Sequence, residues 1–289
     1  MANYISQHKK HFNFKTFVQN ALKEDVGDGD HSALATIPVN KKGKCHLLVK
    51  ENGILAGVEA AKEIFKIIDP KFKVTTFIKD GTPVKMGDIA FIVEGSSQKL
   101  LTAERLVLNV MQRMSGIATK TNYLQSLCKG TKTKVIDTRK TTPGFRFFEK
   151  WAVVIGGGSN HRFGLYDMIM LKDNHIDFCG GILEALDATH TYLKKTKKKL
   201  PIEVETRTLN DVKLILEKGG FQRIMLDNYS IADTKKAVAL IGNKYEVESS
   251  GGITEKTIAN YAKCGVDFIS VGALTHHVKS LDLSLKAIK

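Results

Sequence analysis

Positively charged side chains recur directly after short apolar runs in the middle of this sequence. The run KVID is followed by Thr138, Arg139 and Lys140, and the run MIML is followed by Lys172. Three consecutive glycines and a Ser-Asn pair precede His161 and Arg162. An arginine fork can bind a carboxylate or a phosphate through two parallel hydrogen bonds, and lysine offers the same groups a point charge. These residue types predict a pocket for a substrate that carries several negative charges.

Acidic residues belong to the next two runs. Glu203 and Glu205 lie in the run IEVE, and Asp227 ends the run RIMLD. Fixed carboxylates suit sugar hydroxyls, a metal ion or a positive charge that develops during a reaction. A pocket of both signs is therefore predicted.

Small residues follow the last two runs. They are Ser249, Ser250, Gly251 and Gly252 in one loop, then Gly272 and Ala273 in the other, with His276 close behind. Small residues let a phosphate approach backbone N–H groups, and a helix expected to begin near Thr254 would add a favourable dipole. These two loops predict a phosphate site.

Six short apolar runs must position all of these groups. They occupy residues 134–137, 168–171, 202–204, 223–226, 246–248 and 268–271. Helical patterns lie between them, so the runs predict βα units with parallel strands. Six units are too few for an eight-fold barrel, and the pattern leaves both an open doubly wound sheet and a six-unit barrel possible. In a barrel, the polar residues after the strands would share one rim, which is where barrel active sites lie.

The first 115 residues lack this repeat and predict an α+β domain. Apolar spacing predicts helices at 14–25 and 58–68, strands at 44–50 and 72–79, and then helices at 102–114 and 117–128. Another helix is predicted over 147–155, directly before the three glycines.

Composition sets limits on the class of protein. With 43% hydrophobic and 26% charged residues among 289, the chain is typical of a soluble globular protein. No stretch approaches the roughly 20 apolar residues of a membrane span, and the first residues contain no apolar signal region. Cys45, Cys128, Cys179 and Cys264 are too far apart in sequence for a zinc motif. Reduced thiols and a cytoplasmic location are expected.

The net charge of +14 leaves a nucleic-acid-binding protein as an alternative. Its densest basic run, at 194–199, has no interleaved aromatic residues and suits the solvated C-terminal end of a helix. We therefore expect neither nucleic acid nor a membrane as a partner. Strongly salt-dependent binding to nucleic acid would favour the alternative.

Several motifs resemble those of the quinolinate phosphoribosyltransferases, also called carboxylating nicotinate-nucleotide pyrophosphorylases. In the order of that family they are ER at 104–105, QRMSGIAT at 112–119, DTRKTTPG at 137–144, GGG at 156–158, NHR at 160–162, LKDNH at 171–175, LDN at 226–228, ESSGG at 248–252 and VGALTH at 271–276. They extend over nearly the whole chain from about residue 14, and together they are highly specific.

The resemblance implies both a fold and a reaction. The fold is an N-terminal α/β sandwich over 1–115, joined by the tail at 277–289, and an incomplete, roughly six-stranded α/β barrel over 116–276. The reaction converts quinolinate and phosphoribosyl pyrophosphate into nicotinate mononucleotide, pyrophosphate and CO2 with magnesium. It is a step of de novo NAD synthesis.

The resemblance also implies roles for individual residues. The two carboxylates of quinolinate would be bound by Arg139, His161, Arg162 and Lys172. Arg105 would come from a neighbouring subunit, which requires at least a dimer. Phosphates would be bound by Lys140, Ser249, Ser250, Gly251, Gly252, Gly272 and Ala273. Thr138 and His276 are expected to bind substrate as well. Glu203 and Asp227 would lie near the ribose and its magnesium, and with Lys140 they are the expected catalytic residues. The acidic strand leaves open whether Glu203 or Glu205 is the functional acid, and Glu203 is favoured.

Two alternatives stay close to this family. A related phosphoribosyltransferase could act on a base with one carboxylate, such as nicotinate, but the four clamping residues suffice for two carboxylates. A relative of the same fold that serves metal transport would have a decayed site, and the intact cationic set argues against it.

Overall fold

The computed structural model describes residues 2–8 and 10–288. These residues form two compact units. The first contains the described residues up to Asn122, the segment Thr141–Gly157 and the residues from Thr275 on. The second contains Tyr123–Lys140 and Gly158–Leu274. Among the described residues, no helix combines the length and the apolar character that a membrane crossing requires.

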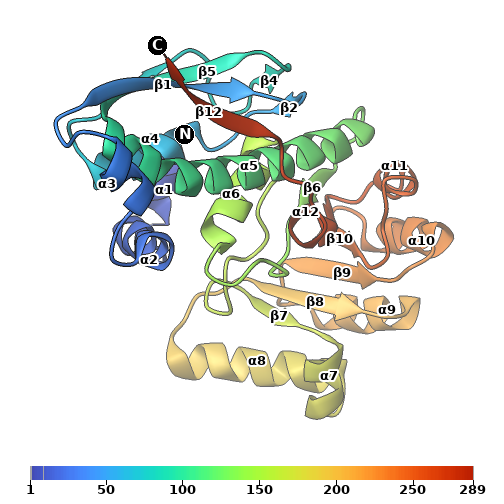
Figure 1. Cartoon of the computed structure of the whole chain (residues 1–289). Helices are drawn as coiled ribbons and strands as arrows, with labels where there is room; N and C mark the ends of the chain where they lie inside the picture. Colours follow the sequence, from blue (N-terminus) through green and yellow to red (C-terminus); the bar gives the residue numbers. More distant parts are fainter. Residues whose placement is uncertain (1, 9, 289) are drawn as a thin grey trace. The chain divides into compact units, whose positions relative to one another are not determined.

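An antiparallel sheet with the strand order β12-β1-β5-β3 organises the first unit (Figure 1). Its strands are β1 (Lys42–Val49), β3 (Lys73–Thr76), β5 (Ile89–Ser96) and β12 (Leu283–Ile288), and β2 (Gly53–Ile54) pairs with β4 (Pro83–Val84). The helices are α1 (Ala2–Gln7), α2 (Phe14–Val26), α3 (His31–Thr36), α4 (Val58–Ile68), α6 (Arg146–Ile155) and most of α5 (Ser97–Leu127). The rings of Phe65 on α4 and Phe91 on β5 meet edge to face in the core.

Helix α5 corrects one prediction, because it runs without a break where two helices, at 102–114 and 117–128, were expected. Gly116, which lies between the two predicted helices, is required by packing and does not end a helix. A Cβ at this position would lie 2.2 Å from the carbonyl oxygen of Lys279, so only glycine allows the two backbones to approach. Its neighbour Ser115 accepts a hydrogen bond from the backbone N–H of Ala56 at 2.9 Å.

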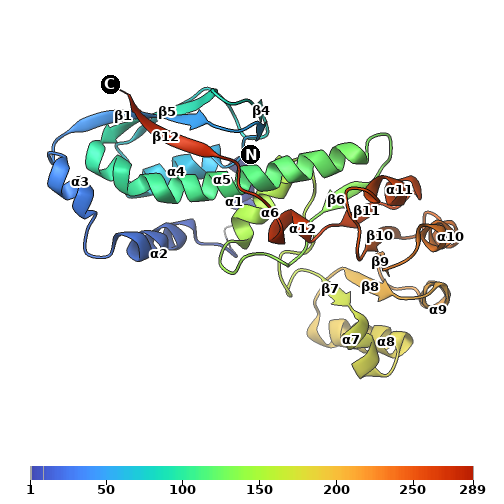
Figure 2. The ribbon, with the colours of Figure 1, turned by 45° about the vertical axis from the view of Figure 1, so that its right-hand side comes forward.

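Six parallel strands form the second unit, in the order β6-β11-β10-β9-β8-β7 (Figure 2). They are β6 (Lys134–Ile136), β7 (Ile169–Leu171), β8 (Ile202–Thr206), β9 (Arg223–Asp227), β10 (Glu246–Ser250) and β11 (Phe268–Ser270). The helices between them are α7 (Asp173–Cys179), α8 (Ile182–Thr196), α9 (Leu209–Lys218), α10 (Ile231–Ile241) and α11 (Ile258–Lys263), and α12 (Ala273–His276) follows β11.

The predicted fold class is confirmed, with six parallel strands in place of a complete barrel. Strands β6 and β7 end the sheet order and do not pair with one another. One local prediction is wrong: the helix after β10 begins at Ile258, and residues 255–257 before it form a turn. The small residues at 249–252 therefore do not lead directly into a helix N-terminus.

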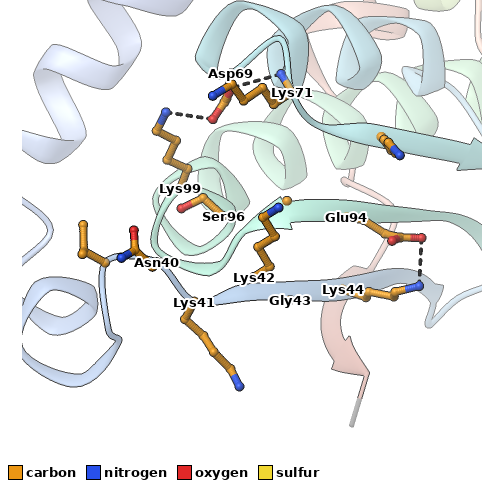
Figure 3. Close-up of a pocket in the computed structure, with 13 residues that line it drawn as sticks. Asn40, Lys41, Lys42, Gly43, Lys44, Asp69, Lys71, Glu94, Ser96 and Lys99 are labelled. Carbon is orange, nitrogen blue, oxygen red and sulfur yellow. Dashed lines mark hydrogen bonds and ion pairs between the residues drawn. The ribbon is translucent and has the colours of Figure 1, made fainter.

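A hollow of about 630 Å³ at one end of the first unit's sheet accounts for part of the positive charge (Figure 3). Six lysines and two acidic residues line it. Lys99 pairs with Asp69 at 2.8 Å, and Lys44 pairs with Glu94 at 3.0 Å. No predicted site residue lines this hollow. Its lysines therefore add to the net charge without belonging to the predicted site.

Candidate active site

The polar residues predicted to share a rim lie at the carboxyl ends of the strands of the second unit. Arg139 follows β6, Lys172 follows β7, and Asp227 ends β9. Ser250 ends β10, and Gly272 comes two residues after β11. All six strands run parallel, so these ends lie on the same side of the sheet.

Two arginines are near enough for their charges to interact, and both follow the end of β6 or the parallel pairing of Ser159 with Ile136 of β6. Arg162 is partly buried, and this burial lowers the pKa of its guanidinium. The positive charge of Arg139 lowers that pKa further, whereas Glu203 and Asp167 act in the opposite direction. Like charges held together in a partly desolvated position favour an anion between them. The pair Arg139 and Arg162 is therefore suited in charge to an anionic substrate group.

A cation and two acids meet at the ends of β7, β8 and β9. The Nζ of Lys172 lies 3.4 Å from Oε2 of Glu205, and the backbone N–H of Asp173 donates to Oε1 of Glu205 at 3.2 Å. Burial raises the pKa of Glu205, the charge of Lys172 lowers it, and the charge of Asp227 raises it. Glu205 and Asp227 are thus the acidic pair at the strand ends.

Glu203 lies deeper in the unit than this pair. Its side chain is 0% exposed, and its Oε2 lies 3.0 Å from Nε2 of His161. The same nitrogen lies 3.3 Å from Oε2 of Glu248, which is also 0% exposed. His161, with 4% of its side chain exposed, therefore faces two buried carboxylates. We call His161, Glu203, Glu248 and the neighbouring Arg223 the buried charge layer.

The titration of the layer follows from these contacts. Burial lowers the pKa of His161, but the two glutamates outweigh it and raise the pKa to about 9. Burial and the charge of Glu248 raise the pKa of Glu203 to about 7, against the opposing effects of His161 and Arg223. Burial also acts to raise the pKa of Glu248, but His161, Ser270 and Arg223 together hold it below its ordinary value.

A metal ion fits the rim better than the buried charge layer. The ligand atoms of His161, Glu203 and Glu248 lie within 4.8 Å of one another, which is close enough for a common ion. However, Nη1 of Arg223 lies 3.3 Å from Glu248 and 4.0 Å from Glu203 and supplies positive charge already. Mg²⁺ also prefers oxygen ligands to imidazole. The carboxylates of Glu205 and Asp227 suit Mg²⁺ in chemistry and lie at the rim.

The loop after β10 has the features of a phosphate-binding turn. The hydroxyl of Ser249 is buried and has no hydrogen-bond partner among the described residues. Gly251 has a φ of +89°, and a Cβ there would lie 2.2 Å from Oδ1 of Asn228. At Gly252, with a φ of +59°, a Cβ would meet nothing within 4 Å. The loop thus approaches Asn228 closely on one side and is open on the other.

The remaining predicted residues fall into two groups. Thr138 and Lys140 lie beside Arg139, where the Thr138 hydroxyl accepts from the Lys140 backbone N–H at 3.1 Å. Ala273 begins α12 after Gly272. Arg105 and His276 belong to the first unit, Arg105 exposed on α5 and His276 next to His277 at the end of α12.

Sequence reasoning did not single out Asp137, Arg223 and Glu248 as parts of the site. Asp137 is fully buried and accepts hydrogen bonds from the His161 backbone N–H at 2.9 Å and from Asn160 at 2.5 Å, so it anchors the loop that carries Arg162. Glu248 begins the motif ESSGG but was given no role, and Arg223 was visible only as a charged residue inside a strand of the predicted core. Such residues are rarely buried unless they are paired, which was the available signal.

Comparison with known proteins decides the family. Residues 30–115 match the N-terminal domain, and residues 117–286 the C-terminal domain, of quinolinate phosphoribosyl transferase. The chain belongs to the quinolinate phosphoribosyl transferase family. The chloroplastic carboxylating nicotinate-nucleotide pyrophosphorylase of Oryza sativa subsp. japonica is 46% identical to it, covering 95% of this chain and 78% of that protein. The probable carboxylating nicotinate-nucleotide pyrophosphorylase of Bacillus subtilis is 38% identical, covering 95% and 93%.

Solved structures of the quinolinate phosphoribosyl transferase family agree with the fold. The crystal structure of NadC from Streptococcus pyogenes matches with a TM-score of 0.89 and 36% sequence identity, covering 99% of this chain and 98% of that chain. The agreement extends over both units, so the α/β sandwich and the incomplete barrel are features that this chain shares with the family.

Proposed function

We propose that this chain transfers the phosphoribosyl group of phosphoribosyl pyrophosphate to quinolinate. The products are nicotinate mononucleotide, pyrophosphate and CO2. The observation that carries this function is the adjacent pair Arg139 and Arg162 on the rim, with Lys172 after the next strand. Membership of the quinolinate phosphoribosyl transferase family supports the same reaction.

Quinolinate fits the cations of the rim because it carries carboxylates on two neighbouring ring carbons. Arg139 and Arg162 would bind the carboxylates through paired hydrogen bonds, and Lys172 would add a third positive charge. His161, the fourth residue expected to bind quinolinate, is buried next to Arg162 in the chain and faces Glu203 and Glu248. Fixing both carboxylates also fixes the ring, so that its nitrogen faces the sugar carbon that it attacks.

Phosphates of the second substrate suit the small-residue loops. The unpartnered hydroxyl of Ser249 and the open side of Gly252 would face a phosphate, with Ser250 and Gly251 in the same turn. Gly272 and Ala273 extend this surface from β11, and Thr138 and Lys140 extend it from β6. His276 remains a predicted substrate-binding residue.

Glu205 and Asp227 are the acids that we assign to the ribose, in place of Glu203 and Asp227. Positive character develops on the ribose ring as pyrophosphate leaves, and carboxylates at the strand ends stabilise it. The side chain of Glu203 is 0% exposed and faces His161, so we do not assign it to the sugar. Glu205 and Asp227 would also hold Mg²⁺, which supplies charge neutralisation to pyrophosphate when it is bound.

Decarboxylation follows transfer without a dedicated base. The ring nitrogen becomes positively charged once its bond to the sugar forms and the bond to pyrophosphate breaks. The bond from the neighbouring ring carbon to its carboxylate can then break, leaving its electron pair on the ring as CO2 departs. A proton from solvent completes nicotinate mononucleotide. The site has only to hold the ring during this step.

An assembly of at least two copies is part of the proposal, with Arg105 of one subunit completing the site of another. Arg105 is exposed on α5, which leaves its guanidinium accessible to a partner.

A cytoplasmic location is also proposed. All four cysteines are free thiols, as a reducing compartment requires. Relatives from Oryza sativa and Nicotiana tabacum are named chloroplastic and mitochondrial, and cell fractionation distinguishes these locations from the cytoplasm.

Direct assay of the two substrates tests this function. The protein is mixed with phosphoribosyl pyrophosphate, Mg²⁺ and either quinolinate or nicotinate, and nicotinate mononucleotide is measured by chromatography. We expect product with quinolinate and release of one CO2 per product. Product from nicotinate alone would contradict the dicarboxylate specificity, and loss of activity with EDTA that Mg²⁺ restores would support the metal.

A further inference from the structure

The buried charge layer beneath the rim is the feature of the second unit that the proposed reaction does not use directly. It brings together charged side chains from three neighbouring strands and one loop. Glu203 comes from β8, Arg223 from β9 and Glu248 from β10, and His161 comes from the segment before β7. The exposed fractions of the four side chains are 0%, 12%, 0% and 4% in that order.

Such a layer is costly to fold unless every charge has a partner. The layer meets this condition through its own members. Each glutamate contacts both a histidine and an arginine, because Arg223 lies 3.3 Å from Glu248 and 4.0 Å from Glu203. The guanidinium of Arg223 also lies 4.0 Å from the ring centroid of Phe268 and donates to the exposed Glu246 at 3.0 Å. Ring contact and ion pairs together leave Arg223 little freedom.

The layer connects to the rim through His161. The ring of His161 is held from below by the two glutamates, and its backbone N–H is held by the buried Asp137. The next residue in the chain is Arg162, one of the two rim arginines. The Nδ1 of the His161 ring accepts a hydrogen bond from the backbone N–H of Arg162 at 2.6 Å. A rotation of the ring would therefore break a contact that holds the backbone from which Arg162 extends. An error of about 1 Å in a substrate-positioning group can slow a reaction by roughly 100-fold.

We propose that Glu203, Glu248 and Arg223 are positioning residues, which fix the His161 ring and thereby place Arg162 for the substrate carboxylate. This inference rests on the proposed function for its kinetic consequences, but the fixed ring itself does not depend on the reaction. It assigns Glu203 a role different from the catalytic one expected from sequence. It also adds Glu248 and Arg223 to the residues that determine quinolinate affinity.

A matched pair of variants on β10 tests the proposal. Glu248→Gln keeps the size of the side chain and removes the carboxylate that faces His161, whereas Glu246→Gln removes an exposed carboxylate whose ion pair, among the described residues, is with Arg223. We expect Glu248→Gln to raise KM for quinolinate by about tenfold while KM for phosphoribosyl pyrophosphate changes less than about twofold. Glu246→Gln should leave both constants within about twofold of the parent. Equal quinolinate constants in the two variants would overturn the proposal.

A spectroscopic readout separates this proposal from the function itself. In the parent protein, the Nε2–H of His161 should give a downfield proton resonance that exchanges slowly with water, because Nε2 is buried and lies 3.0 and 3.3 Å from carboxylate oxygens of Glu203 and Glu248. The resonance should be shifted or lost in Glu248→Gln and in Glu203→Gln, and kept in Glu246→Gln. Its absence from the parent would refute the fixed ring, whatever the activity. Its presence in a protein that does not convert quinolinate would refute the function alone.

Conservative replacement at Arg223 covers the case in which the glutamine variants do not fold. Arg223→Lys keeps the charge between the two glutamates but loses the planar contact with Phe268. We expect it to keep the His161 resonance and to raise KM for quinolinate less than Arg223→Met does. If both replacements raised that constant equally, a charge between Glu203 and Glu248 would not be what positions the ring.

Discussion

Lys172 and Glu205 contact one another across the ends of β7 and β8, with 3.4 Å between Nζ and Oε2. One cation expected to bind quinolinate is therefore already paired with one acid expected near the ribose. Each holds the other in position before a substrate binds. Lys172 can then exchange the carboxylate of Glu205 for a carboxylate of the substrate, and Glu205 can exchange the charge of Lys172 for positive charge near the ribose. The pair couples the two halves of the predicted pocket.

Replacing Glu205 should separate the two candidate acids. Glu205→Gln removes negative charge beside the developing positive charge of the ribose, so we expect kcat to fall by about 100-fold. Glu217→Gln, on the exposed surface of α9, is the control and should change kcat little. Steady-state kinetics at saturating substrates measure both. Full activity in Glu205→Gln would return the catalytic role to Glu203.

Arg162 should require the arginine fork and not only positive charge. Arg162→Lys keeps the charge but loses the paired hydrogen bonds, so we expect KM for quinolinate to rise about tenfold. Arg207→Lys changes an exposed arginine that pairs with Asp177, and it serves as the control. Calorimetric titration with quinolinate checks the affinity without turnover. A lysine that binds quinolinate as tightly as arginine would contradict the clamp.

The free energy of unfolding should fall as the pH rises above neutrality. The pKa of His161 is raised to about 9 in the folded chain, against an unfolded value near 6.5, so the folded state retains its proton to higher pH. The stabilisation is fully present below about pH 6.5 and is lost as the pH passes 9; it amounts to roughly 3 kcal/mol. The raised pKa of Glu203, about 7, acts in the same direction.

Urea unfolding at pH 6.5 and pH 9.5 measures this dependence. His161→Gln should be less stable than the parent at the lower pH and should show a smaller change between the two. His31→Gln replaces a histidine on α3 with 76% of its side chain exposed and should behave like the parent. A parent whose stability rises over this interval would show that the layer does not bind the proton as inferred.

Gly251 and Gly252 provide a matched test of the phosphate loop. Gly251→Ala places a Cβ against Asn228 at a positive φ, so it should cost about 1–3 kcal/mol of stability and raise KM for phosphoribosyl pyrophosphate. Gly252→Ala meets no neighbouring atom and should cost about 1 kcal/mol through its positive φ alone. Thermal unfolding and substrate kinetics measure both. If the two variants raised KM for phosphoribosyl pyrophosphate equally, the close approach of Gly251 to Asn228 would not be the cause of the increase.

The repeat of apolar runs was sufficient to predict the six parallel strands and the residues at their ends. Each predicted run overlaps an observed strand, because a short buried strand leaves a continuous apolar signature. The helix over 147–155 is also confirmed as α6. These features depend on local sequence, which is why they could be predicted.

Features that depend on distant contacts could not be predicted in the same way. Two helices were predicted where α5 is continuous, and Gly116 between them serves to admit the backbone near Lys279, a residue far away in the sequence. The choice between Glu203 and Glu205 depends on depth. Both residues lie in one strand, and alternation places them on the same face. Only the contact with His161, from another part of the chain, distinguishes them.

The pairing of β12 with β1 has a consequence for the order of folding during synthesis. Lys44 lies opposite Ile288 and Val49 opposite Leu283, so residues near the start of the chain await a strand made near its end. The strands of the second unit all emerge from the ribosome earlier than β12. The sheet that begins first is therefore the last to be completed, and until then an edge of β1 is exposed to unwanted pairing with other chains.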